Sequence, residues 1–196
     1  MTEAEETYYT DERWQNWLSR VAEEDLDPES EESARLLFNM QDDAAIAVAK
    51  VVSAYKEGEI DDEVATEELR DIGEIVLSEV EFESEEKLML VDGVQMSLRC
   101  VFAASEEYVA SGPAPEGSIR DHVEAAVAAE EEEDLDTAFA HTVQAGTLII
   151  EDDDELDVNV LEDIEYGLVS DWVSGLDSLQ SALADPEVIE EDEEDE

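Results

Sequence analysis

The sequence predicts an all-α protein, a bundle of six or seven helices followed by a disordered acidic C-terminal tail. Three observations lead to this fold class. Apolar residues recur at three- and four-residue steps through most of the chain. Ser, Thr or Asp stands where such a segment begins, and glycine or proline follows where it ends. No alternation typical of strands has comparable strength, and no repeat of fixed period is present.

The first two helices follow from their caps. Thr10 is a good N-cap for a short first helix. Asp27 followed by Pro28 predicts the start of a second, long helix that continues to Lys56 and ends at Gly58. If this helix is kinked, the polar stretch 41–43 is where we expect the kink.

Two further helices are expected before residue 112. Asp61 begins the third, directly after the glycine that ends the second, which is typical of a helical hairpin. Ser84 caps the fourth, whose apolar residues lie on more than one side. We therefore expect the fourth helix to be the central element of the bundle.

The segment 112–117, rich in glycine and proline, predicts a linker between two helical halves. The N-terminal half is 1–111, and the C-terminal half is 118–185, packed with it as one domain. Helices are expected near 119–131, 135–150 and 160–183, the last stopped by Pro186. Residues 186–196 are expected to be a disordered acidic tail.

The charge balance indicates the environment of the protein. The 60 Asp and Glu residues against nine Lys and Arg give a net charge of -51. At about 1 M salt the Debye length is about 3 Å, so such repulsion is screened. Because the acids are spread along the whole chain, we expect a halophilic protein hydrated with K+ rather than a nucleic-acid mimic or solubilising chaperone. No signal peptide or spanning segment is recognised, so a cytoplasmic location and no membrane partner are expected.

Two strings of residues carry a resemblance to a known family. The run TYYTDERWQNWLSRV at 7–21 and the run LLFNMQDDAAIAVAKVV at 36–52 are similar to an uncharacterised archaeal family, domain of unknown function 2150. Many members of this family are haloarchaeal. The resemblance implies an archaeal, cytoplasmic protein, and it brings no activity, ligand or catalytic residue with it.

Motifs for chemistry are sparse. Cys100 stands alone in an apolar run, which favours a core thiol. His122 and His141 lack the spacing of metal ligands, although each could meet a carboxylate in the folded bundle. The acidic loop near Asp152 lacks the offsets and glycine of a calcium site. Arg99 lies in a mostly apolar helix, where pairing with a carboxylate is favoured over binding an anion.

The sequence favours a non-enzymatic interaction or structural module without metal or cofactor. Its partner is another protein or a second copy; nucleic acid is unlikely because no basic patch exists in the sequence. The candidate docking stripe is Trp14, Trp17, Leu18 and Val21 on the first helix. The same stripe could instead pack on the protein's own bundle. The alternative function is a metal-binding bundle or enzyme whose carboxylates and histidines meet only in three dimensions.

Overall fold

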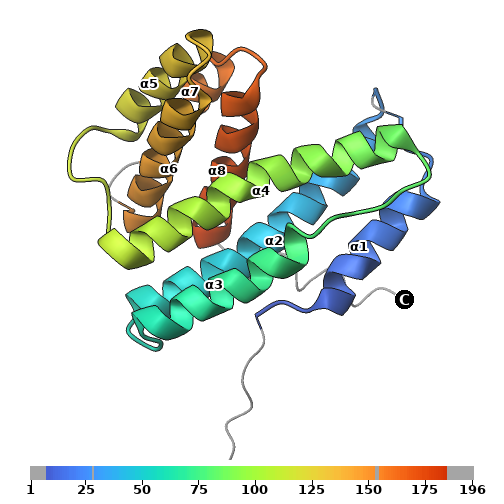
Figure 1. Cartoon of the computed structure of the whole chain (residues 1–196), viewed down its shortest axis with the longest axis horizontal. Helices are drawn as coiled ribbons and strands as arrows, with labels where there is room; N and C mark the ends of the chain where they lie inside the picture. The colour runs from blue at the N-terminus through green and yellow to red at the C-terminus, as the bar shows by residue number, and fades with distance from the viewer. Residues whose placement is uncertain (1–7, 28, 153–154, 185–196) are drawn as a thin grey trace, which may run out of the picture.

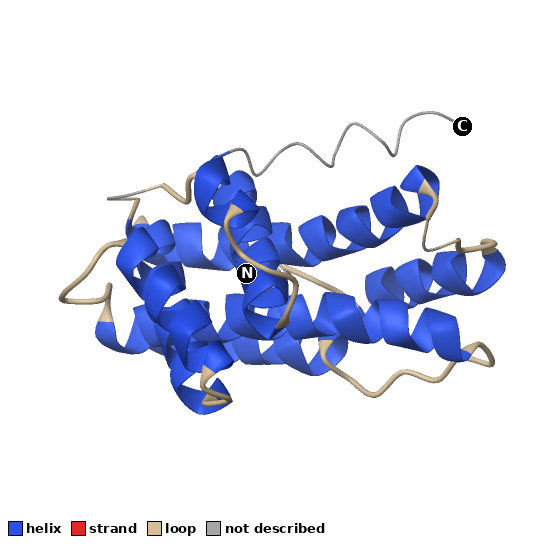
Figure 2. Ribbon diagram, turned by 90° about the horizontal axis from the view of Figure 1, so that it is seen from above, coloured by secondary structure: helices blue, strands red, loops and turns tan. Residues whose placement is uncertain are grey.

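The computed structural model describes residues 8–27, 29–152 and 155–184. Figures 1 and 2 show that this part of the chain consists of α-helices and loops, without strands. The helices are α1 (Asp11–Glu23), α2 (Glu31–Lys56), α3 (Asp62–Val76), α4 (Glu85–Ser111), α5 (Ile119–Glu131), α6 (Leu135–Glu151), α7 (Val158–Glu162) and α8 (Leu168–Ala184). The predicted all-α bundle is therefore confirmed, with seven substantial helices and the five-residue α7. The predicted tail at 186–196 lies outside the described residues.

Helix α4 crosses the middle of the molecule, with α1 to α3 largely on one side and α5 to α8 on the other (Figure 1). It packs against α2, α3, α6 and α8, so the prediction of a central fourth helix is correct. Helix α8 returns to pack on α2, and its Leu179 and Ala182 join the apolar cluster of the first helices. The two predicted halves thus contact each other through α8, while their boundary stays a prediction.

Helix α4 is also long and apolar enough to cross a membrane by length and composition. More than half of its most apolar window is buried within the bundle. A helix that is apolar all round and covered by four neighbours has the properties of a core helix. In the structure, α4 is the core helix of the bundle.

Caps define most helix starts as predicted. The side chains of Thr10, Asp61 and Ser84 each accept a backbone N–H from the first turn of α1, α3 and α4. Gly58, with φ of 75°, follows the end of α2 in the left-handed conformation that glycine adopts without strain.

The predicted start of α2 at Asp27 and Pro28 is wrong, because α2 begins at Glu31. Asp27 instead forms a turn: its carboxylate accepts the N–H of Glu29, and its carbonyl accepts the N–H of Ser30. Such local bonds from aspartate compete with helix formation. The helix then runs from Glu31 to Lys56 as one element, so residues 41–43 do not interrupt it.

The single helix predicted over 160–183 is also wrong, because the chain is divided into α7 and α8. Across the bundle, Glu130 Oε1 accepts the N–H of Leu168 at 2.7 Å, which caps the start of α8. A Cβ at Gly167 would lie 2.6 Å from that oxygen, so a larger residue there would displace the end of the flexible Glu130 side chain. This long-range cap is invisible in the periodicity of the segment, which explains the error.

Candidate functional site

The candidate docking stripe on α1 lies against the protein's own bundle. Trp14 and Val21 are fully buried in the core, and Trp17 and Leu18 are half-buried against it. This arrangement corresponds to the intramolecular alternative for the stripe. An open surface for a partner therefore has to be sought on other helices.

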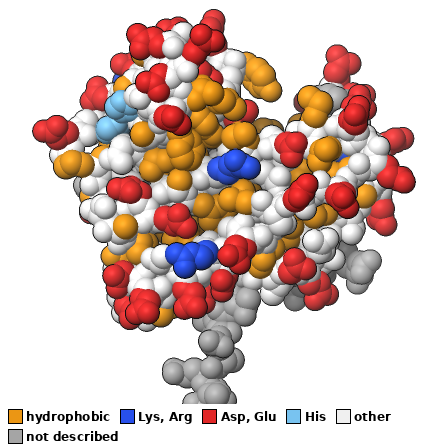
Figure 3. Space-filling view, viewed as in Figure 1, with side chains coloured by type: hydrophobic (Ala, Val, Ile, Leu, Met, Phe, Trp, Pro, Cys, Tyr) orange, Lys and Arg blue, Asp and Glu red, His pale blue; other side chains and the backbone are white. Residues whose placement is uncertain are grey.

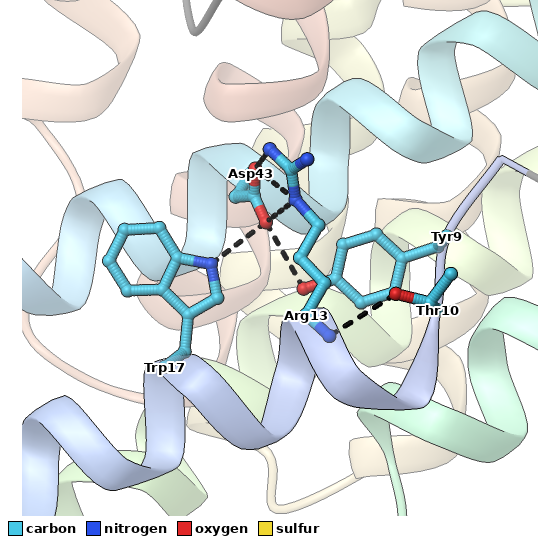
Figure 4. A network of polar contacts seen from close by, with 5 residues as sticks. All are labelled: Tyr9, Thr10, Arg13, Trp17 and Asp43. Carbon is cyan, nitrogen blue, oxygen red and sulfur yellow. Dashed lines mark hydrogen bonds and ion pairs between the residues drawn. The ribbon is translucent and has the colours of Figure 1, made fainter. Parts of the chain in front are cut away.

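The buried carboxylate of Asp43 holds α1 on α2 (Figure 4). Its side chain is only 1% exposed, and it forms an ion pair with the guanidinium of Arg13. It also accepts the Trp17 indole N–H at 2.8 Å and the Tyr9 hydroxyl at 3.1 Å. A buried carboxylate with this many donors is satisfied rather than reactive.

The same contacts set the properties of Tyr9. Burial, followed by the negative charge of Asp43, raises the pKa of Tyr9 far above its ordinary value. The hydroxyl therefore stays protonated and remains a donor. In the sequence, the only sign of this cluster is the polar stretch 41–43 inside an otherwise apolar helix, which predicted a kink instead.

The structure brings His122 of α5 and His141 of α6 together. Their Nδ1 atoms are 3.2 Å apart, and the Nε2 of His122 lies 2.9 Å from the carbonyl oxygen of Glu116. Because that carbonyl can only accept, His122 Nε2 carries a proton, and the Nδ1 of neutral His122 then accepts a hydrogen bond from the Nδ1–H of His141. Nothing in the sequence predicted that these two residues would meet each other rather than carboxylates.

The shape of this pair is that of a hydrogen bond. The ring centroids are 5.5 Å apart, which leaves the two Nδ1 atoms nearly on the line between the ring centres. Two imidazoles on one tetrahedral metal would instead aim both lone pairs at a third point to the side of that line. The rings would have to turn before the pair could chelate a metal.

Other reactive groups are isolated. Cys100 is fully buried, and this burial raises the pKa of its thiol well above the ordinary value. Within the described part of the chain, no three His, Cys, Asp or Glu side chains are grouped so that they could hold a metal ion. Of the acidic loop near Asp152, residues 153 and 154 lie outside the described residues.

An open groove lies between α3 and α4, with a volume of about 410 Å³. Its floor is apolar and is lined by the buried side chains of Leu69 and Phe102 and by the half-buried Leu77 and Ala103. The Phe102 ring packs over Gly73, where an added Cβ would lie 3.7 Å away, in ordinary contact. Four charged residues complete the lining: Arg70, Glu74, Arg99 and Glu106.

The two arginines of this groove are exposed and available. Among the described residues, neither Arg70 nor Arg99 forms an ion pair, although the chain has 60 carboxylates. The ion pair with a carboxylate that the sequence predicted for Arg99 is thus not found among the described residues. Figure 3 shows two basic side chains in the middle of this face with apolar side chains between them, and acidic side chains over the rest.

The groove is a site that sequence reasoning largely missed. Arg99 was singled out, but Arg70 was not, because the two are 29 positions apart and meet only through the antiparallel packing of α3 on α4. Arg13 and Arg20, which both lie on α1, have other contacts. Arg13 is bound to Asp43, and Arg20 lies 4.7 Å from the centroid of the Trp17 ring.

Residues 7–192 match the model of a family described as "Uncharacterized protein conserved in archaea (DUF2150)". The chain belongs to this family. Membership covers nearly the whole sequence, so the resemblance noticed in the two N-terminal strings extends through α8. Neither the curated proteins nor the solved structures include a significant match to this chain. The family thus relates the chain to archaeal proteins but indicates no function, so the function has to be inferred from the structure.

Proposed function

We propose that this protein is a non-enzymatic interaction module that docks another protein chain on the face formed by α3 and α4. The observation that carries the proposal is the groove, in which Arg70 and Arg99 flank an apolar floor without an ion pair among the described residues. The apolar residues of this lining that remain partly exposed are Leu77 and Ala103. Apolar surface bordered by charged groups is typical of protein interfaces, and arginine is enriched in them.

The local charge of the groove supports the same function. Its lining contains two arginines and two glutamates, so its formal charge is zero on a molecule whose net charge is -51. A protein from an equally acidic proteome would be repelled by most of the surface and least repelled here. The polar groups of Asp43 and of the histidine pair are bonded within the fold.

We also propose that the module works in the cytoplasm of a halophilic archaeon, with K+ screening its surface. The support is the charge of -51 together with the archaeal family. Lowering KCl from molar to about 0.1 M extends the screening length to about 10 Å, and helicity should fall. The helices beyond Arg120 should lose protection first in hydrogen exchange, since no Lys or Arg follows. Unchanged circular dichroism over that range would contradict this proposal.

Site-specific photo-crosslinking tests the docking function. A photoreactive amino acid replaces half-buried Ala103 in the groove, and in a control protein it replaces exposed Ala128 on α5. In a haloarchaeal host, we expect a discrete adduct from position 103, identified by mass spectrometry and lost when Arg99→Glu is added. Equal labelling from both positions, or no adduct from position 103, would overturn the proposed function.

A further inference from the structure

We infer that the occupant of the α3–α4 groove is a second copy of this chain, related to the first by a two-fold axis. The inference rests on the proposed function and names the partner of that site. What points to a second copy is the arrangement of the four charges around the groove, which is self-complementary.

The position of each charge follows from the packing of the two helices. Helices α3 and α4 are antiparallel: Gly73 faces Phe102 at the middle of the groove, and Gln95 donates to the carbonyl of Val76 at its end. Three residues before Gly73 stands Arg70, and four residues after Phe102 stands Glu106. These two residues therefore share one end of the groove.

The other end carries the reverse pair. Glu74 follows Gly73 on α3, and Arg99 precedes Phe102 by three residues on α4. Each helix thus contributes one positive and one negative charge, and the signs alternate around the four corners of the groove. The side chains of all four residues are exposed, so they can reach across to a facing surface.

Such an alternating pattern matches its own copy. In a face-to-face dimer the two-fold axis lies in the plane of the contact. If the axis runs along the groove, each charge faces the charge at the same end of the other helix, which has the opposite sign. If the axis runs across the groove, each charge faces the one at the other end of its own helix, again of opposite sign. Both arrangements place arginine opposite glutamate at every corner.

The surrounding surface makes this the place where two copies can meet. Two molecules of charge -51 repel each other strongly, and the neutral groove is a patch where contact adds no like charge. The half-buried apolar residues of its lining, Leu77 and Ala103, would be withdrawn from water on association. Because salt screens the long-range repulsion while leaving the apolar contact, the dimer should be favoured in molar KCl.

The test measures molar mass of the full chain by light scattering and sedimentation in molar KCl over a range of concentrations. We expect a species of twice 21.8 kDa that dissociates on dilution. Arg99→Glu places like charges opposite each other and should raise the dimer dissociation constant about tenfold or more. Arg35→Glu removes an exposed arginine of α2 that does not line the groove, and it should leave the dissociation constant unchanged.

Two double variants provide the decisive control, because charge reversal in the right partner restores complementarity. Arg99→Glu with Glu74→Arg restores the dimer if the axis runs along the groove, and Arg99→Glu with Glu106→Arg restores it if the axis runs across. Exactly one of the two should recover the wild-type dissociation constant. Circular dichroism in the same buffer verifies that each variant is folded.

A monomer at every concentration in molar KCl would overturn the inference, as would a dimer that Arg99→Glu leaves intact or that neither double variant rescues. The proposed function has a separate failure. If the chain is monomeric but Ala103 still crosslinks a different protein, docking stands and self-association is wrong. If position 103 crosslinks nothing, the docking function itself is wrong.

Discussion

Helices α1 and α8 both pack on the central helices, but they do so by opposite means. Helix α8 lies so close to α4 that a Cβ at Gly175 would stand 2.2 Å from the carbonyl oxygen of Ser97. Helix α1 is held by long side chains instead: Trp14 fills the core, and Arg13 and Tyr9 reach the buried carboxylate of Asp43. One contact depends on the absence of side chains, and the other depends on large ones.

These two kinds of contact should be sensitive to different substitutions. The contact of α8 with α4 has no room, so any added atom there must displace backbone, which a packed interior resists. The contact of α1 with α2 depends on a few groups that fill space and neutralise one buried charge. Substitutions should therefore separate a steric response at α8 from a cavity and charge response at α1.

The largest effect is expected from Trp14→Ala. The side chain is fully buried, so its loss leaves a cavity and should lower the free energy of unfolding by about 3–5 kcal/mol. Urea unfolding in molar KCl measures this. Trp17→Ala is the matched control, because Trp17 is only half-buried and mainly loses its bond to Asp43. Equal losses from the two variants would show that the core of α1 is not centred on Trp14.

Gly175→Ala should come next. The added methyl group meets the backbone of Ser97, so α8 has to shift, at a cost of about 1–3 kcal/mol. Gly93→Ala on α4 is the opposite control: no atom lies within 4 Å of its Cβ position, so the better helix propensity of alanine should stabilise the protein by about 1 kcal/mol. If Gly175→Ala also stabilises, α8 does not approach α4 as closely as described.

The charge component of the α1 contact should appear at alkaline pH. Burial and Asp43 raise the pKa of Tyr9 above its ordinary value of 10.0, so the folded state holds this proton more tightly than the unfolded state. The stabilisation is complete below pH 10 and declines at higher pH, by about 1.4 kcal/mol per pH unit. Unfolding of wild type and Tyr9→Phe between pH 8 and about 11 should show the two curves converging. Parallel curves would contradict a linked tyrosine.

The smallest effect concerns a like-charge pair where α8 meets α2. Burial first, and the negative charge of Asp42 second, raise the pKa of Asp177. The folded state therefore disfavours its ionised form, so Asp177→Asn should stabilise the protein at neutral pH by at most about 0.5 kcal/mol, because solvent screens the partly exposed group. The gain should vanish as the pH falls and Asp177 becomes protonated.

Asp92→Asn on α4 serves as the control for that measurement, since it changes the net charge equally at an exposed position. If both substitutions stabilise the protein to the same extent at every pH, the effect of Asp177→Asn reflects net charge alone. A gain that is specific to Asp177 and lost in acid would place the repulsion at the contact between α2 and α8.

The fold could be predicted well where its cause is local. Caps such as Thr10 and Ser84 and the left-handed glycine at 58 act within a few residues, so the sequence showed them directly. The errors occurred where a distant residue intervened. Glu130 caps α8 from another helix and breaks a segment whose periodicity predicted one continuous helix.

The all-helical class, the acidic character and the scarcity of catalytic motifs could be predicted from the sequence, because composition and periodicity are properties of the chain. Three features of the candidate sites became visible only in the folded protein: Arg70 and Arg99 share a groove, Asp43 is a buried anchor, and His122 meets His141. These pairings arise because the packing of helices places residues that are far apart in the chain side by side. The register between two packed helices cannot be predicted from the spacing of residues along either helix.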